Sequence, residues 1–207
     1  SKLLRQAVNY GFDKQKMMTY LRNGIGIPAY GGFIPRGLPG YNESIGFKFQ
    51  PDKAKQLVQQ FKTETEISSP EITITTTSNY LSFCEYIQRE LQKIGITVNV
   101  DVIPAATLKD AKANGKLDMF RASWVADYPD AENYLSLYSS KNFAPNGPNY
   151  THFKSDQFDV WYQEAFTITD TKKRESLYTK MDSLVMSSAP VVPLFYDEVV
   201  RFTRKSI

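Results

Sequence analysis

The feature that most constrains the fold is a strand-helix-strand pattern between residues 72 and 102. The β-branched run 72–77 favours a strand, and residues 81–94 carry apolar side chains at helical spacing. Gly95 ends this helix, and apolar residues alternate over 96–102, as in a second strand. Because a helix joins them, we expect the two strands to be parallel, with a right-handed crossover and the helix on one face of the sheet.

The same pattern recurs once further along the chain. Residues 104–112 are predicted to form a short helix closed by Asn114-Gly115, and 117–123 to form the next strand. Ser78 or Asn79 is expected to cap the helix of the first unit. Two successive units of this kind are typical of an open α/β sheet.

Helices are predicted on both sides of these units. The expected elements are a helical hairpin over 3–10 and 13–23, a long ordered loop over 24–46, a helix from Pro51 to Phe61, a loop over 141–151, helices around 158–166 and 177–185, and a buried strand over 191–196. No repeat or linker divides the chain. We therefore expect one α/β domain over 1–207, with a mixed sheet flanked by helices.

Charge and cysteine usage exclude several classes of protein. Lys and Arg number 25 against 22 Asp and Glu, and they are spread along the chain, so nucleic-acid binding is not expected. The single cysteine, Cys84, lies among apolar residues and is expected in the core. No apolar run approaches the roughly 18 residues of a membrane helix, and no signal sequence follows Ser1. These features leave open that the chain was cut from a longer precursor.

The segment 121–134 is the strongest candidate for a functional site. It joins a short apolar strand to charged and aromatic side chains, and Pro129 prevents continuation of a strand ladder. Asp130 is predicted to cap a short helix that runs through Tyr138. Asp127 should therefore lie just past the carboxyl end of a strand, where open α/β sheets bind ligands.

Other interpretations of this segment remain open. The same residues fit an ordinary turn with Trp124 in the core. Asp127 and Asp130 also allow a hydrolase with an acid/base pair, although the chain holds a single histidine, His152, and no pattern of metal ligands. We expect a binding protein rather than an enzyme, without a metal or cofactor.

Several segments together resemble one protein family. They are 4–10 with Asp13, 31–35, 38–41, 52–57, Ile87-Gln88 with Leu91 and 94–96, Trp124-Val125-Ala126-Asp127-Tyr128-Pro129-Asp130-Ala131, and 189–196. This set is similar to the family 5 solute-binding proteins of ABC importers, the oligopeptide, dipeptide and nickel class. The resemblance implies the second, C-terminal lobe of a two-lobe periplasmic-binding-protein-like fold (type II, cluster C), with the first lobe missing.

The resemblance also implies roles for individual residues. Asp127 stands where peptide-binding relatives pair a carboxylate with the α-amino group of the ligand, and Arg121 where an arginine can meet a ligand carboxylate. Trp124 and Tyr128 would wall the pocket. The expected ligand-binding residues are Arg121, Trp124, Val125, Ala126, Asp127 and Tyr128.

The implied partners are a short peptide, the missing first lobe and a membrane permease. The implied location is periplasmic or extracytoplasmic, with a lipid anchor at the missing N-terminus as a possible addition. Nickel chelates, haem and other small solutes remain alternative ligands on the same scaffold, and a pure interaction module is an alternative of another class. The lobe alone is expected to bind weakly, because it supplies only half of the contacts.

Overall fold

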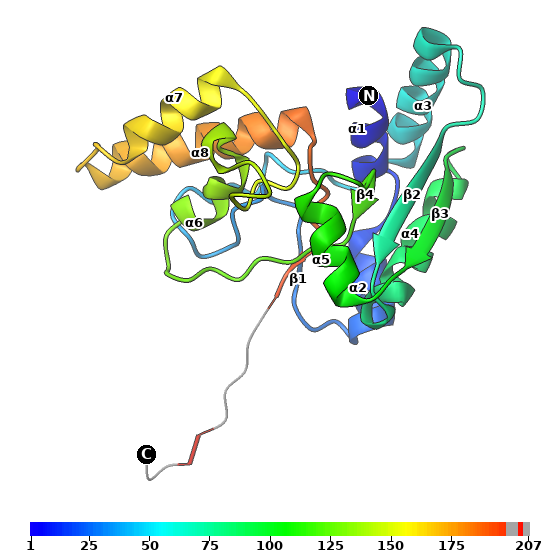
Figure 1. Ribbon diagram of the computed structural model, residues 1–207, viewed down its shortest axis with the longest axis horizontal. Coiled ribbons are helices and arrows are strands. Elements are labelled where there is room, and N and C mark those ends of the chain that lie inside the picture. The colour runs from blue at the N-terminus through cyan, green and yellow to red at the C-terminus, as the bar shows by residue number, and fades with distance from the viewer. Residues whose placement is uncertain (198–202, 205–207) are drawn as a thin grey trace.

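The computed structural model describes residues 1–197 and 203–204, so residues 198–202 and 205–207 of the predicted domain lie outside the description (Figure 1). The helices are α1 (Lys2–Tyr10), α2 (Lys14–Arg22), α3 (Pro51–Thr65), α4 (Leu81–Gln92), α5 (Ala105–Ala113), α6 (Glu132–Leu135), α7 (Asp156–Ala165) and α8 (Thr171–Ser188). The strands are β1 (Ile27–Pro28), β2 (Glu71–Thr76), β3 (Thr97–Val102), β4 (Met119–Phe120) and β5 (Phe195–Tyr196). The α/β class is confirmed.

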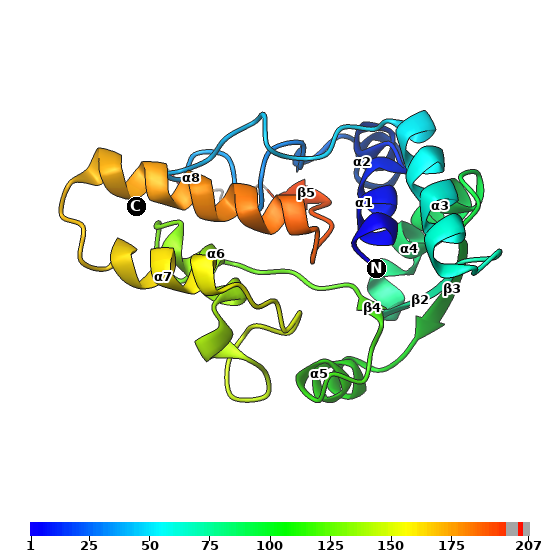
Figure 2. The same ribbon diagram turned by 90° about the horizontal axis from the view of Figure 1, so that it is seen from above.

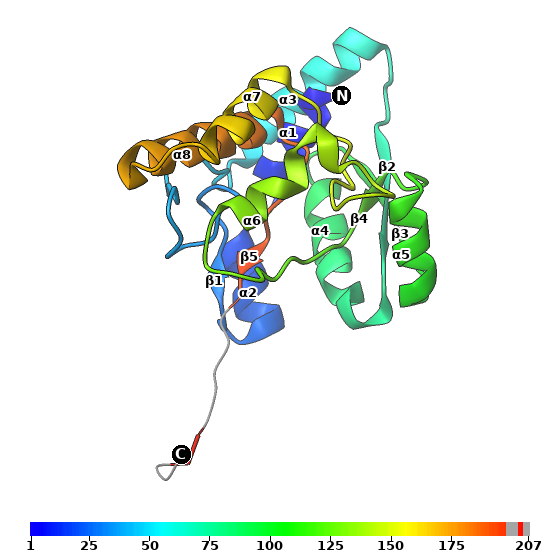
Figure 3. The same ribbon diagram turned by 60° about the vertical axis from the view of Figure 1, so that its left-hand side comes forward.

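The predicted crossover units build a parallel sheet with the strand order β3-β2-β4. Ile74 on the central strand faces Val100 on one side and Met119 on the other. The first unit places β3 beside β2, and the second carries the chain back across to the other edge of β2. Figures 2 and 3 show α4 and α5 on opposite sides of this sheet.

Helix α4 fixes the sheet through its buried side. Cys84 and Leu91 on this helix are buried in the same core cluster as Ile74, so the expected core position of Cys84 is confirmed. Gly95 follows with φ +86°, a conformation that costs glycine little. The predicted cap at the other end is wrong, because residues 78–80 form a 3₁₀ turn and no side chain caps α4.

The antiparallel pairing lies in a separate sheet. Strands β1 and β5 form a two-stranded sheet, so the parallel and antiparallel strands do not share the one mixed sheet that was expected. The strand predicted over 191–196 is confined to its last two residues, and the strand predicted over 117–123 to Met119–Phe120. Pro190 and Pro193 explain the first difference, because proline cannot donate a hydrogen bond to a ladder.

A second core lies under α6, α7 and α8, which stand apart from the parallel sheet in Figures 1 and 2. Leu135, Phe158, Met181 and Val185 are fully buried there. Ser155 caps α7 by accepting a hydrogen bond from the backbone of Phe158. The helices predicted around 158–166 and 177–185 are therefore confirmed, and both are amphipathic helices packed against each other.

Asp182 ties the long loop over 24–46 to α8. Its carboxylate is fully buried and accepts hydrogen bonds from the backbone N–H groups of Phe33 (2.8 Å) and Ile34 (3.1 Å). A side chain on Gly32 would place its Cβ 1.8 Å from Asp182 Oδ2, so this approach requires glycine. Burial raises the pKa of Asp182 to about 6, although the two backbone hydrogen bonds oppose this shift.

Lys14 holds the same loop against α2. The side chain is fully buried, and Nζ donates to the carbonyl oxygens of Ala29 (2.9 Å) and Phe47 (3.5 Å). Burial lowers the pKa of Lys14 to about 7. Two buried ionisable groups therefore hold a glycine-rich loop that has almost no regular structure of its own.

Candidate functional site

The segment 121–130 leads from the sheet to α6 and has no regular secondary structure (Figure 2). The Arg121 N–H still donates to the Thr75 carbonyl oxygen (3.0 Å), which extends the pairing of β4 by one residue. Beyond that point the backbone leaves the sheet. Asp127 is therefore farther from the carboxyl end of β4 than the sequence indicated, and it lies on a bridge between the two cores.

Helix α6 anchors Trp124. The indole Nε1 donates to Asn133 Oδ1 at 2.7 Å, and Asn133 is buried. Trp124 itself is half-buried, so one part of its ring packs while another part stays accessible. This hydrogen bond fixes the orientation of the indole relative to α6.

The tip of the segment is exposed. Val125 has 83% of its surface accessible, Asp127 is exposed, and Ala126 between them is half-buried. Among the described residues, no hydrogen bond or salt bridge reaches the Asp127 carboxylate. An exposed carboxylate beside an exposed apolar side chain is available to a ligand or to another protein surface.

Two cations lie over aromatic rings at the sheet end of the segment. The Arg121 guanidinium carbon is 3.3 Å from the centroid of the Tyr80 ring. Lys112 Nζ lies 4.9 Å from the centroid of Tyr150 and 5.7 Å from that of Phe120. Burial lowers the pKa of Lys112, and the positive charge of Arg121 lowers it further. Within the described part of the chain neither cation forms a salt bridge.

Tyr128 lies at the other end of the segment and contacts Glu132. Its hydroxyl donates to Glu132 Oε2, and the Tyr162 hydroxyl donates to Oε1 of the same carboxylate. Burial, followed by the contact with Glu132, raises the pKa of Tyr162. Sequence reasoning missed Lys112, which forms part of no motif. Glu132 and Asn133 lie within the candidate segment 121–134, but no sequence pattern assigned them a role.

Asp130 has a structural role. Oδ1 accepts a hydrogen bond from the Glu132 N–H (2.9 Å) at the start of α6, and Oδ2 lies 3.8 Å from Arg174 Nη2. The prediction that Asp130 caps this helix is wrong, because Ala131 is the N-cap residue and no side chain caps α6. The helix ends at Leu135, and a 3₁₀ turn continues through Tyr138. Because its carboxylate is already engaged, Asp130 offers little to an acid/base pair with Asp127.

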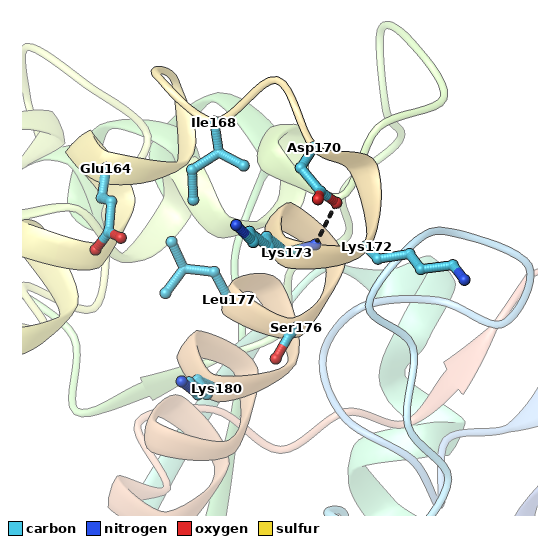
Figure 4. A pocket seen from close by; sticks show the side chains of 8 residues that line it. All are labelled: Glu164, Ile168, Asp170, Lys172, Lys173, Ser176, Leu177 and Lys180. Atoms are coloured by element: carbon cyan, nitrogen blue, oxygen red, sulfur yellow. Dashed lines mark hydrogen bonds between the residues drawn. The ribbon is translucent and has the colours of Figure 1, made fainter.

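Two shallow hollows lie on the α7–α8 side of the described residues. The larger one, of about 400 Å³, lies between the end of α7 and the start of α8, where Asp170 accepts a hydrogen bond from the Lys173 N–H (Figure 4). The smaller one, of about 290 Å³, includes Tyr128 in its lining. Neither Trp124 nor Asp127 lines the larger hollow, so the size of a hollow alone does not locate the ligand site.

His152 is the single histidine of the sequence. His152 Nε2 lies 3.2 Å from the Ala144 carbonyl oxygen, in the loop before α7. No three His, Cys, Asp or Glu side chains gather as a metal site within the described residues. In the same part of the chain, none of the helices has the length and apolar character needed to cross a bilayer.

Comparison with known sequences identifies a family. Residues 1–146 match the family described as "Bacterial extracellular solute-binding proteins, family 5 Middle". Heme-binding protein A of Haemophilus influenzae is 28% identical over 92% of this chain and 36% of its own length. The dipeptide-binding protein of Escherichia coli is 25% identical over 99% of this chain and 39% of its own length. The chain thus spans well under half of these relatives.

Comparison with solved structures agrees. A periplasmic binding protein of Helicobacter pylori, DppA, in complex with the peptide STSA, superposes with a TM-score of 0.87 and 30% identity. It covers 95% of this chain, and the match covers 38% of that protein. NikA of Brucella suis, solved with Fe(III)-EDTA, has a TM-score of 0.78 at 20% identity, which shows a shared fold. From its sequence match and its fold, the chain belongs to family 5 of the bacterial extracellular solute-binding proteins.

Proposed function

We propose that this chain is one lobe of an extracytoplasmic two-lobe binding protein that captures short peptides for an ABC importer. A first lobe, encoded outside these residues, would close over the ligand about a hinge, and a membrane permease would recognise the closed form. Relatives named as dipeptide-binding and oligopeptide-binding proteins support this proposal. A lipid anchor ahead of these residues would be compatible with it.

The proposal rests on the exposed carboxylate of Asp127. Its carboxylate is exposed and is not engaged by any of the described residues. A ligand ammonium placed there would form a charge-assisted hydrogen bond. Closure of a second lobe would exclude water from the pair, and an ion pair in a dry cleft depends strongly on having both partners.

The end of the segment next to the sheet could bind the C-terminal carboxylate of a peptide. Arg121 and Lys112 are partly desolvated cations held over aromatic rings, and a ligand carboxylate would relieve their mutual repulsion. A guanidinium can bind a carboxylate through two parallel hydrogen bonds. The segment therefore presents an anion and a cation to a zwitterion, as a free peptide requires.

Trp124 and Tyr128 are proposed as the walls of the site, with Val125 and Ala126 between them. Flat aromatic surfaces supply contact area without demanding one particular side chain. Recognition would then rest on the charged ends and on the ligand backbone, which suits peptides of varied sequence.

A second candidate ligand is haem, because heme-binding protein A is 28% identical to this chain. Nickel chelates and other small solutes are further candidates on the same fold. A hydrolase based on Asp127 and Asp130 is not favoured, since Asp130 already accepts a backbone hydrogen bond and lies near Arg174.

The test is calorimetric titration of the protein expressed with all the sequence that its gene encodes. Short peptides with free and acetylated amino termini are compared on the wild type and on Asp127→Asn. We expect acetylation and the substitution each to weaken binding roughly 100-fold, about 3 kcal/mol. Applied together they should cost little more than either alone, because both remove the same ion pair.

Asp118→Asn is the matched control, because Asp118 is an exposed carboxylate just before β4. It should leave the peptide affinity unchanged. Equal binding of free and acetylated peptides would contradict the role of Asp127. If no peptide binds in any form, haem titration followed by absorbance becomes the decisive experiment.

A further inference from the structure

We propose that the hollow between α6, the end of α7 and α8 is a separate binding site for an organic cation, a protonated amine or guanidinium on a short apolar body. The hollow measures about 290 Å³. The side chains that carry the argument are Tyr128, Asp130, Glu132, Phe166, Arg174 and Tyr178. Neither Asp127 nor Arg121 lines it, although Tyr128 is shared with the proposed peptide site.

Two aromatic side chains give the hollow its apolar rim. Phe166 has 63% of its surface accessible and Tyr128 has 48%, which is unusual for a phenylalanine that follows a packed helix. The Phe166 ring is held edge-on to Tyr162, with centroids 5.2 Å apart, so it is oriented rather than free. Exposed ring faces next to negative charge are the surfaces that attract organic cations.

The charge balance of the hollow is negative. Asp130 and Glu132 contribute two carboxylates, and Arg174 is the one cation in the lining. Arg174 lies 3.8 Å from Asp130, and both side chains are partly exposed, so this pair is weak. The hydroxyls of Tyr128 and Tyr162 hydrogen-bond to Glu132 but leave its charge in place. One negative charge therefore remains to be balanced.

The larger hollow nearby has the opposite character. It is lined by Lys172, Lys173 and Lys180 against Glu164 and Asp170, and no aromatic side chain contributes (Figure 4). Residues of α7 and α8 line both hollows. Of the two, only the smaller one combines exposed aromatic rings with more carboxylates than cations. A cation should therefore distinguish the two hollows.

The size of the hollow limits the ligand. Pockets for small molecules range from about 300 to 1,000 Å³, and this hollow is at the lower limit of that range. It fits a group as large as a lysine side chain. Such a group can come from a free amine or from a basic side chain of a bound peptide.

The first experiment titrates N-acetyl-lysine N-methylamide into the protein expressed with all the sequence that its gene encodes, followed by heteronuclear NMR. The matched ligand is N-acetyl-norleucine N-methylamide, which keeps the aliphatic chain and lacks the charge. We expect the lysine compound to shift the resonances of Phe166 and Glu132 at least fivefold more than the norleucine compound. Equal responses to the two compounds would overturn a cation site.

Variants connect the response to the hollow. Glu132→Gln keeps the shape and removes one charge, and Phe166→Leu changes an exposed side chain, so both should remain folded by circular dichroism. Each is expected to weaken lysine-amide binding at least fivefold. Asp127→Asn should have no effect, because the acetylated ligand has no α-amino group. Unchanged affinity in both hollow variants would exclude this location.

A second arm separates the two sources of the cation. The peptides Ala-Lys-Ala and Ala-norleucine-Ala, both with free amino termini, are titrated into the wild type and into Asp127→Asn. A lysine preference that disappears with Asp127→Asn assigns the hollow to a side chain of the bound peptide. A preference that persists, and is shared by the capped amide, assigns it to free amines. No preference in either arm refutes the proposal, whatever the result for Asp127.

Discussion

The pH dependence of stability should report directly on Asp182. The structure places this carboxylate at zero exposure, and burial raises its pKa from 3.8 to about 6. The folded state therefore binds the proton more tightly than the unfolded state does. The contribution of protonated Asp182 to the free energy of unfolding is fully present below pH 3.8 and is lost as the pH rises through about 6. A shift of about two pKa units corresponds to about 3 kcal/mol.

The perturbation that isolates this effect is Asp182→Asn. Asparagine has the same shape but does not titrate, and its single amide oxygen can accept from only one of the N–H groups of Phe33 and Ile34. The variant therefore carries a constant penalty of about 1–3 kcal/mol for the unsatisfied backbone donor. The pH-dependent part of the wild-type stability should be absent from it.

The assay is urea unfolding followed by circular dichroism between pH 4 and pH 8. The stability advantage of the wild type over Asp182→Asn should shrink by about 2–3 kcal/mol from pH 4 to pH 7 and then stay constant. Asp118→Asn, at an exposed carboxylate, serves as the control. Parallel curves for the wild type and Asp182→Asn across the whole range would refute the reasoning.

Three further substitutions test neighbouring features by urea unfolding. Lys14→Met should show the opposite pH trend, because burial lowers the Lys14 pKa to about 7. The free energy of unfolding of the wild type should rise by up to about 5 kcal/mol relative to that of the variant as the pH increases from below 7 to above 10.5. Trp124→Phe should cost about 1–3 kcal/mol, since it leaves the buried Asn133 Oδ1 without its donor. Gly32→Ala should cost about 2–3 kcal/mol, because its Cβ would lie 1.8 Å from Asp182 Oδ2.

Local patterns predicted those parts of the fold whose contacts are close in sequence. Asp13 accepts the Lys16 N–H at the start of α2, and Asn23 ends that helix with φ 51°, both as expected from the sequence. The crossover through α4 was likewise predictable, because a helix between two apolar strands leaves few alternatives.

Contacts distant in sequence were not predictable. Strand β5 consists of the two residues that pair with β1, about 170 positions earlier in the chain, and no local pattern indicates that limit. The buried charge of Asp182 was also invisible, since its partners are backbone groups of Phe33 and Ile34. Side-chain motifs cannot reveal partners that are backbone amides.

In the candidate site, too, local sequence patterns predicted some features and missed others. The segment 121–134 was found from its own residues, but the sequence did not indicate that Asn133 and Glu132, at its α6 end, hold the side chains of Trp124 and Tyr128. Helix α6 is short and is stabilised by the second core rather than by the sheet. The orientation of the proposed ligand-binding side chains therefore depends on how α6 packs against α7 and α8.

This dependence changes how substitutions near the site should be interpreted. A change at Glu132 alters the cation hollow and, through the Tyr128 hydroxyl, one wall of the proposed peptide site. A change at Phe166 also alters the hollow, but the ring that Phe166 contacts is Tyr162 on α7, which lies outside the segment that carries Asp127. If Glu132→Gln weakens peptide binding while Phe166→Leu does not, the effect passes through Tyr128. If both weaken it equally, the two sites are energetically coupled through the shared packing of α6.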